Sequence, residues 1–214
     1  MEAYRDGDIE VVRLGPLGPW GNNAYVICDT SARESMIVDM PAEGEKILAA
    51  LADARVAAIV ATHWHNDHWM SYDVVRGATG APVHVFESEV NVPPERIDVR
   101  VRDGQELRVG AARVRVVHTP GHTPGSISLL LGKVLLTGDA LFPGGPGRTQ
   151  TPEDLSTAVR SIVERLYPLP DDVLVWPGHG DTTTIGRSRL EYQVFAGRPH
   201  RPDLAGDVLW NTEE

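Results

Sequence analysis

The sequence contains very little cysteine and no long apolar segment. Cys28 is the single cysteine among 214 residues, so no internal disulfide can form, and a reducing cytoplasm is the expected compartment. The longest apolar runs, Ile47–Ala52 and Val56–Ala61, have six residues each, whereas a membrane-spanning helix needs about 20. The first residues also lack the basic and apolar regions of a secretory signal. We therefore expect a cytoplasmic protein that does not associate with membranes.

Positive charge is also scarce. The chain has 20 basic residues against 30 acidic ones, a formal net charge of −10, and this field repels nucleic acid unless basic residues are concentrated locally. The modest basic groups at Arg96–Arg102 and Arg108–Arg115 have no interleaved aromatic residues, so nucleic acid is not expected as a partner. The content of 42% apolar and 23% charged residues is that of an ordinary globular protein, and residues 1–214 are predicted to form one domain.

Strands and helices are mixed along the chain. Short apolar runs at Asn23–Cys28 and Ala57–Ala61 predict strands. A stripe of apolar residues within Glu43–Arg55 predicts a helix. Thr151-Pro152-Glu153-Asp154 is typical of a capped helix start. Further strands, two hairpins and two more helices are expected at Ile9–Leu14, Ser35–Asp39, Pro82–Phe86, Glu106–Val109 with Arg113–His118, Ser126–Leu131 with Lys133–Thr137, Val173–Trp176, Met70–Gly80 and Arg187–Ala196. This order predicts an α+β fold with two packed sheets and helices outside them.

The segment Thr62-His63-Trp64-His65-Asn66-Asp67-His68 follows one of the apolar strands. Side chains two residues apart in an extended segment point the same way, so His63 and His65 can share one centre. Asp67 and His68 fall where a helix begins, and can serve a neighbouring centre. Three imidazoles and a carboxylate match the ligand preferences of zinc and similar divalent metals. The alternative is that they are polar turn residues that cap the strand and the helix.

Three more residues that can bind metal follow apolar strands, each beside glycine. His122 lies in Thr119-Pro120-Gly121-His122, Asp139 follows Thr137-Gly138, and His179 follows Pro177-Gly178. Strand ends that meet at one edge of a sheet would bring all seven side chains together. The seven therefore form a candidate metal site, and the turn-residue alternative becomes weak.

This pattern resembles the metallo-β-lactamase superfamily over nearly the whole chain. The resemblance implies a four-layer αββα sandwich with a metal centre at one edge. It also implies that His63, His65 and His122 bind a first divalent ion, that Asp67, His68 and His179 bind a second, and that Asp139 bridges the two. Zinc is the expected metal, with iron or manganese as alternatives, because similar ligands accept all three. One branch of penicillin-cleaving relatives has cysteine where this chain has Asp139, so hydrolysis of penicillin-type lactams is not expected.

The chemistry expected of such a centre is hydrolysis. Two ions about 3.5–4 Å apart share a water and lower its pKa to roughly 7, and Asp67 is the candidate catalytic residue that holds the resulting hydroxide. The segments Gly138-Asp139-Ala140-Leu141-Phe142, Gly147-Arg148-Thr149 and Pro177-Gly178-His179-Gly180 are most similar to short glyoxalase II-like hydrolases, which cleave thioesters. Few residues follow His179, so the helical domain that binds glutathione in full-length glyoxalase II is not expected here. A small thioester or ester is the expected substrate.

Alternatives stay open within the same resemblance. Persulfide dioxygenases share the Gly147-Arg148-Thr149 element and bind one iron through positions that correspond to His63, His122 and Asp139. Lactonases share the ligands and are a further alternative. The net charge disfavours the nucleases of the superfamily. A non-catalytic scaffold is also disfavoured, because it has no need of two open metal sites. Arg148 is the best candidate for contact with an anionic substrate. Trp20 and Trp69 are further candidates for the substrate pocket, although packing is the favoured role for Trp69. A homodimer is an open alternative for assembly.

Overall fold

The computed structural model describes residues 2–211 and contains two β-sheets packed face to face. One sheet has the strand order β1-β2-β3-β4-β5-β6-β7 and the other the order β13-β12-β11-β10-β9-β8. The strands are β1 (Glu2–Asp6), β2 (Ile9–Leu17), β3 (Asn22–Asp29), β4 (Glu34–Val38), β5 (Arg55–Val60), β6 (Val83–Phe86), β7 (Val99–Val101), β8 (Glu106–Val109), β9 (Ala112–His118), β10 (Ile127–Leu131), β11 (Val134–Gly138), β12 (Leu174–Pro177) and β13 (Thr183–Thr184). β4 to β7 run parallel to one another, as do β11 and β12, and the other neighbouring strands are antiparallel.

Apolar side chains fill both faces of the central strands. In β3, Tyr25 and Ile27 face the other sheet and belong to the core between the sheets. Ala24 and Val26 face the opposite way and belong to a separate core under the helices. This alternation follows from the two-residue period of a strand. It explains why Asn23–Cys28 reads as a nearly continuous apolar run.

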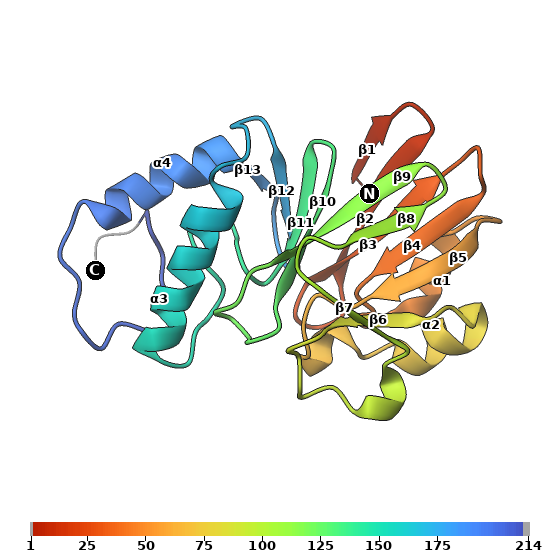
Figure 1. The fold of residues 1–214 in the computed structure, drawn as a ribbon, viewed down its shortest axis with the longest axis horizontal. Helices are drawn as coiled ribbons and strands as arrows, with labels where there is room; N and C mark the ends of the chain where they lie inside the picture. The colour runs from red at the N-terminus through yellow and green to blue at the C-terminus, as the bar shows by residue number, and fades with distance from the viewer. Residues whose placement is uncertain (1, 212–214) are drawn as a thin grey trace.

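Helices form the outer layers, as Figure 1 shows. α1 (Gly44–Ala50) and α2 (Tyr72–Thr79) cover the first sheet, and α3 (Pro152–Ser161) and α4 (Ile185–Ala196) cover the second. α3 continues into a π-helical turn over Ile162–Leu166, and short 3₁₀ turns occur at Asn66–His68 and Pro94–Arg96. The predicted α+β class and the αββα sandwich are confirmed. None of the described helices is long and apolar enough to cross a membrane.

Several boundaries differ from those expected. β2 runs through Leu17, past the predicted end at Leu14, because its register shifts between these residues and pairing with β3 resumes after the glycine and proline. β1 was not predicted, because its residues are mostly exposed and have no apolar face. α3 begins as predicted: the Thr151 hydroxyl accepts from the Asp154 backbone N–H, and the Asp154 carboxylate accepts from the Thr151 backbone N–H.

Candidate metal centre

The segments that carry the candidate ligands meet at one edge of the sandwich. They follow β5, β9, β11 and β12, and the start of β3 lies beside them. Ile127 at the start of β10 donates its backbone N–H to the Thr62 carbonyl at 3.0 Å, and the Asn23 backbone N–H donates to the Gly178 carbonyl at 2.7 Å. Each of these bonds joins the start of a strand in one sheet to a loop of the other sheet. The site therefore lies on the seam between the two sheets.

Asp39, directly after β4, fixes the histidine-rich loop. Its carboxylate accepts hydrogen bonds from the Thr62 backbone N–H and the Thr62 hydroxyl, both at 2.8 Å. It also accepts from His68 Nδ1 at 2.8 Å. Asp39 and His68 are both buried. One carboxylate thus holds the start and the end of the loop that carries four of the seven candidate ligands.

The first cluster consists of His63, His65 and His122. One ligand atom from each residue lies within 4.8 Å of the others, and His122 Nε2 lies 2.8 Å from His65 Nδ1. The rings of His63 and His65 are nearly perpendicular, with centroids 4.8 Å apart. The extended backbone before the 3₁₀ turn therefore places both imidazoles on one centre, as their spacing predicts.

The second cluster consists of Asp67, His68 and His179. Asp67 Oδ2 lies 3.1 Å from His179 Nε2 and 3.5 Å from His68 Nε2. The two Nε2 atoms are 3.2 Å apart. The 3₁₀ turn over Asn66–His68 places the ring of His68 beside that of His63, with centroids 4.2 Å apart, so one short segment supplies residues of both clusters.

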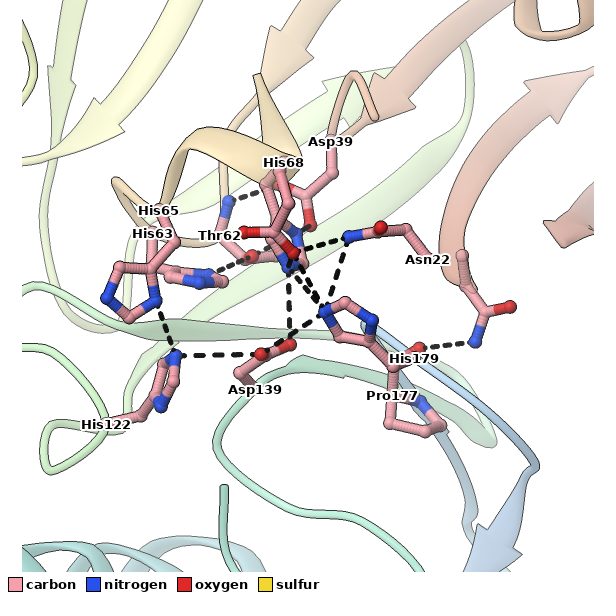
Figure 2. Close-up of polar contacts among 12 residues, drawn as sticks. Asn22, Asp39, Thr62, His63, His65, His68, His122, Asp139, Pro177 and His179 are labelled. Carbon is pink, nitrogen blue, oxygen red and sulfur yellow. Dashed lines mark hydrogen bonds and ion pairs between the residues drawn. The ribbon is translucent and has the colours of Figure 1, made fainter. Parts of the chain in front are cut away.

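Asp139 lies between the two clusters. Its Oδ2 atom is 3.6 Å from His122 Nε2 and 3.5 Å from His179 Nε2, and its Oδ1 atom is 3.4 Å from His68 Nε2. Figure 2 shows these imidazoles and the carboxylate directed toward a common centre. The structure thus brings all seven predicted residues together in two adjoining groups of three with Asp139 in contact with both, and His63, His68 and Asp139 form a further group that links them.

Each of four histidines is held by its outward ring nitrogen. His122 Nδ1 donates to the Arg148 carbonyl at 2.8 Å, and His179 Nδ1 donates to the Trp20 carbonyl at 3.0 Å. The Thr62 hydroxyl, whose proton goes to Asp39, accepts from His63 Nδ1 at 3.1 Å. His68 Nδ1 donates to Asp39, as described above. In a neutral ring whose outward nitrogen carries the proton, the inward Nε2 atom presents a lone pair to the centre.

The electrostatics of the cluster differ from one imidazole to another: they lower the pKa of His63 and His65, raise the pKa of His68 and His179, and keep the carboxylates ionised. Burial lowers the pKa of His63 well below its usual value and also lowers that of His65. Burial acts in the same direction on His68, but the nearby carboxylates of Asp39 and Asp139 outweigh it and raise that pKa. The pKa values of Asp67 and Asp139 are lowered despite burial, through the neighbouring histidines. Both carboxylates are therefore ionised at neutral pH.

Asn22 is a residue of the site that the sequence pattern did not reveal. It is 1% exposed, and its Nδ2 atom donates to Asp67 Oδ2 at 2.8 Å and lies 3.3 Å from His179 Nε2. Asn23 Nδ2 donates to the carbonyls of Pro177 and Gly180 and so anchors the loop that carries His179. The sequence does show two adjacent asparagines at the start of a strand. Only the bridge between Asn22 and His179, however, places Asn22 at the metal centre.

The three candidate substrate residues lie in different places. Arg148 borders a cavity of about 290 Å³ beside His122, Asp139 and His179, and its guanidinium is 3.4 Å from the Asp207 carboxylate. The remaining lining residues include Phe142, Pro143, Pro146, Val208 and Leu209. Trp20 is 58% exposed and borders the opening over Asp67 and His179. These two residues flank the cluster.

Trp69 is instead 5% exposed and packs in the core under α1 and α2. Its indole N–H donates to the His63 carbonyl at 2.8 Å. This is the packing role favoured for it, and through this bond Trp69 supports the backbone of the histidine loop.

The donor set fits divalent metal ions. His63 Nε2 and Asp139 Oδ1 are buried and have no hydrogen-bond partner within residues 2–211, which is costly for polar atoms unless another ligand satisfies them. Imidazole nitrogens and carboxylate oxygens are the ligand atoms that zinc, iron and manganese accept. Gly178 leaves the space open, because a Cβ atom there would lie 2.3 Å from Asp139 Oδ1 and 2.7 Å from His68 Cε1.

A family model described as the metallo-beta-lactamase superfamily matches residues 17–179. The chain belongs to this superfamily. An uncharacterised protein from Aquifex aeolicus is 37% identical to it over 206 residues, which cover 87% of this chain and 97% of that protein. The hydroxyacylglutathione hydrolase GloC from Haemophilus influenzae is 30% identical over 207 residues, which cover 85% and 95% of the two chains.

Solved structures give the same fold. The crystal structure of BLEG-1, a B3 metallo-beta-lactamase, has a TM-score of 0.74 with 32% sequence identity, and the match covers 83% of this chain and 95% of that one. The crystal structure of ETHE1 from Myxococcus xanthus has a TM-score of 0.76 with 31% identity, and the match covers 88% and 86%. The family resemblance and the fold expected from the sequence are thereby confirmed.

Proposed function

We propose that this superfamily member is a metal-dependent hydrolase that cleaves a small thioester or ester. The observation that carries the proposal is the pair of ligand clusters with Asp139 in contact with both, open to a cavity of about 290 Å³. The similarity to GloC, which is named a hydroxyacylglutathione hydrolase, supports a thioester.

Two divalent ions fit this arrangement. His63, His65 and His122 would hold one, and Asp67, His68 and His179 the other, with Asp139 shared between them. Zinc is the favoured metal, and iron and manganese are alternatives. When bound, such a pair lowers the pKa of a water molecule to about 7 and polarises a carbonyl oxygen.

Asp67 is the residue placed to hold the attacking water. Asn22, His68 and His179 surround its Oδ2 atom, whereas no hydrogen bond to Oδ1 occurs within the described residues. Oδ1 can therefore accept a hydrogen bond from water that faces the substrate carbonyl. Water adds to the carbonyl carbon, the carbon–sulfur or carbon–oxygen bond to the leaving group breaks, and the products are a carboxylate, a thiol or alcohol, and one proton.

The walls of the cavity suggest how the substrate is held. Phe142 and Leu209 offer apolar contact, and Arg148 can move from Asp207 to an anionic substrate group because both partners of this ion pair are exposed. Trp20 borders the other side of the opening. A small molecule is the proposed partner of this site.

Metal analysis combined with an activity assay tests the proposal. Protein purified without added metal is analysed for zinc, iron and manganese, and is then assayed with thioesters, esters and lactones. We expect two ions per chain and hydrolysis of a thioester. Asp67→Asn is the test variant, and Asp53→Asn, at an exposed carboxylate that pairs with Arg33, is the matched control. A metal-loaded protein that is inert on all three substrate classes contradicts the proposal.

Oxygenation of a persulfide with a single iron is the second candidate. The 31% identity to ETHE1 and the Gly147-Arg148-Thr149 segment favour it. Two histidines and one carboxylate, here His63, His122 and Asp139, are a ligand set that suits non-haem iron. One tightly bound iron per chain, with consumption of dioxygen in the presence of a persulfide, distinguishes this activity from hydrolysis.

A further inference from the structure

A second cavity borders the histidine loop and shares no lining residue with the Arg148 cavity. It measures about 270 Å³, and we call it the Trp64–Arg96 pocket. Its lining residues are Trp64, Asn66, Trp69, Asn91, Val92, Pro93 and Arg96. Trp64, Asn66, Asn91 and Arg96 carry side-chain N–H groups, and no carboxylate lines the pocket. A pocket of this kind favours an anion over a cation.

Arg96 is the only charged residue that lines the pocket. An aromatic ring, and not a carboxylate, packs against its guanidinium group. Its guanidinium carbon lies 4.7 Å from the centroid of the Tyr72 ring, and Tyr72 in turn packs against Trp69 with centroids 5.9 Å apart. No ion pair or side-chain hydrogen bond of Arg96 is found within residues 2–211, and the residue is half-buried. A cation stacked on an aromatic ring keeps its N–H groups free for a carboxylate or a phosphate.

The pocket adjoins the metal cluster. The Trp64 ring packs against the imidazole of His65 with centroids 4.6 Å apart, and Trp64 is 36% exposed. Asn66 lines both this pocket and the opening that Trp20, Asp67 and His179 border. A substrate whose reacting carbonyl lies at the cluster can therefore reach the pocket by passing over Asn66.

We propose that the Trp64–Arg96 pocket binds a carboxylate or phosphate at the far end of the substrate's leaving thiol, with Arg96 in contact with the anion and Trp64 against the adjoining apolar part. This inference rests on the proposed hydrolase function and narrows its substrate to thioesters of an anionic thiol. The acyl half then occupies the cavity beside Arg148, which borders the cluster at His122, Asp139 and His179.

Paired substrates test the inference on the metal-loaded enzyme. The same lactoyl group is offered as a thioester of glutathione, which carries carboxylates, of coenzyme A, which carries phosphates, and of N-acetylcysteamine, which is uncharged. In Arg96→Gln we expect kcat/KM to fall about tenfold for at least one anionic thioester and to stay within twofold for the uncharged one. Arg96→Lys is expected to recover part of the loss. Arg108→Gln, an equal charge change at an exposed position of β8, is the matched control.

The glutathione and coenzyme A arms identify the anion as carboxylate or phosphate. An equal loss on all three thioesters in Arg96→Gln, or no loss on any, overturns the pocket assignment while leaving the hydrolase proposal intact. If the wild-type enzyme cleaves none of these thioesters but cleaves an ester or a lactone, the hydrolase proposal stands and the assignment to a leaving thiol is overturned. If it is inert on thioesters, esters and lactones, the hydrolase proposal fails. The pocket is then tested by binding of free glutathione and coenzyme A to the metal-free protein, with tryptophan fluorescence as the measurement. Binding that is lost in Arg96→Gln, with the signal absent in Trp64→Phe, supports the pocket, and binding of neither thiol overturns it.

Discussion

Substitution of Gly178 by alanine is the sharpest test of the metal centre, because it adds one methyl group at a known place. The new Cβ atom would lie 2.3 Å from Asp139 Oδ1 and 2.7 Å from His68 Cε1, inside the 3.0 Å limit that real Cβ contacts respect. Gly178 does not have a left-handed backbone conformation, so the effect is steric alone. Either the carboxylate or the loop between β12 and His179 must move by about 1 Å, a displacement that typically costs about 100-fold in rate.

The assay compares bound metal, activity and thermal stability in wild type, Gly178→Ala and Gly77→Ala. Gly77 lies in α2 with no atom within 4 Å of an added Cβ, so alanine there is expected to be neutral or to stabilise by up to about 1 kcal/mol. For Gly178→Ala we expect native secondary structure, fewer than two ions per chain and activity reduced about 100-fold. A Gly178→Ala protein that binds both ions with wild-type affinity and keeps its activity refutes the geometry described here.

Three further predictions concern other parts of the molecule. Asn22→Ala removes the donor to Asp67 Oδ2, so affinity for the second ion is expected to fall roughly 10-fold or more, and competition with a chelator measures it. Asp139→Asn removes the charge shared by the two clusters, and metal analysis is expected to show loss of at least one ion. Hydrogen bonds from the Ala111 and Ala32 backbones lower the pKa of Asp29 to about 2. A lowered carboxyl pKa stabilises the fold above about pH 4 and loses this effect as the pH falls toward 2, so the difference in Tm between wild type and Asp29→Asn is expected to shrink over that range.

The sequence predicted those parts of the fold that have a periodic pattern or a cap. The hairpins around Gly110 and Gly132, and the start of α3 at Thr151, follow from local turn and capping chemistry. β1 and β13 escaped prediction because their residues have no buried face, and pairing with β2 and β12 alone defines them as strands. Such strands depend on neighbours that a local pattern does not specify.

That the seven candidate ligands lie together could be predicted, because each is a metal-binding residue type in a segment that follows a strand. How ions would be shared among them stays a prediction, since His63, His68 and Asp139 also form a group. Asn22 and the carbonyls of Trp20 and Arg148 could not be assigned, since backbone carbonyls carry no residue signature and Asn22 depends on the bridge to His179. The Trp64–Arg96 pocket likewise depends on how the segment around Pro94–Arg96 packs against the histidine loop.

The position of the cluster on the seam between the sheets has a consequence for the order of folding. Asn22 and His179, which lie next to each other at the centre, are 157 residues apart in the chain, so a ribosome must release nearly the whole polypeptide before these side chains can meet. Contacts of such long range form late, after local hairpins and helices. Any ion that needs ligands from both Asp67 and His179 would therefore be bound only once the chain is nearly native.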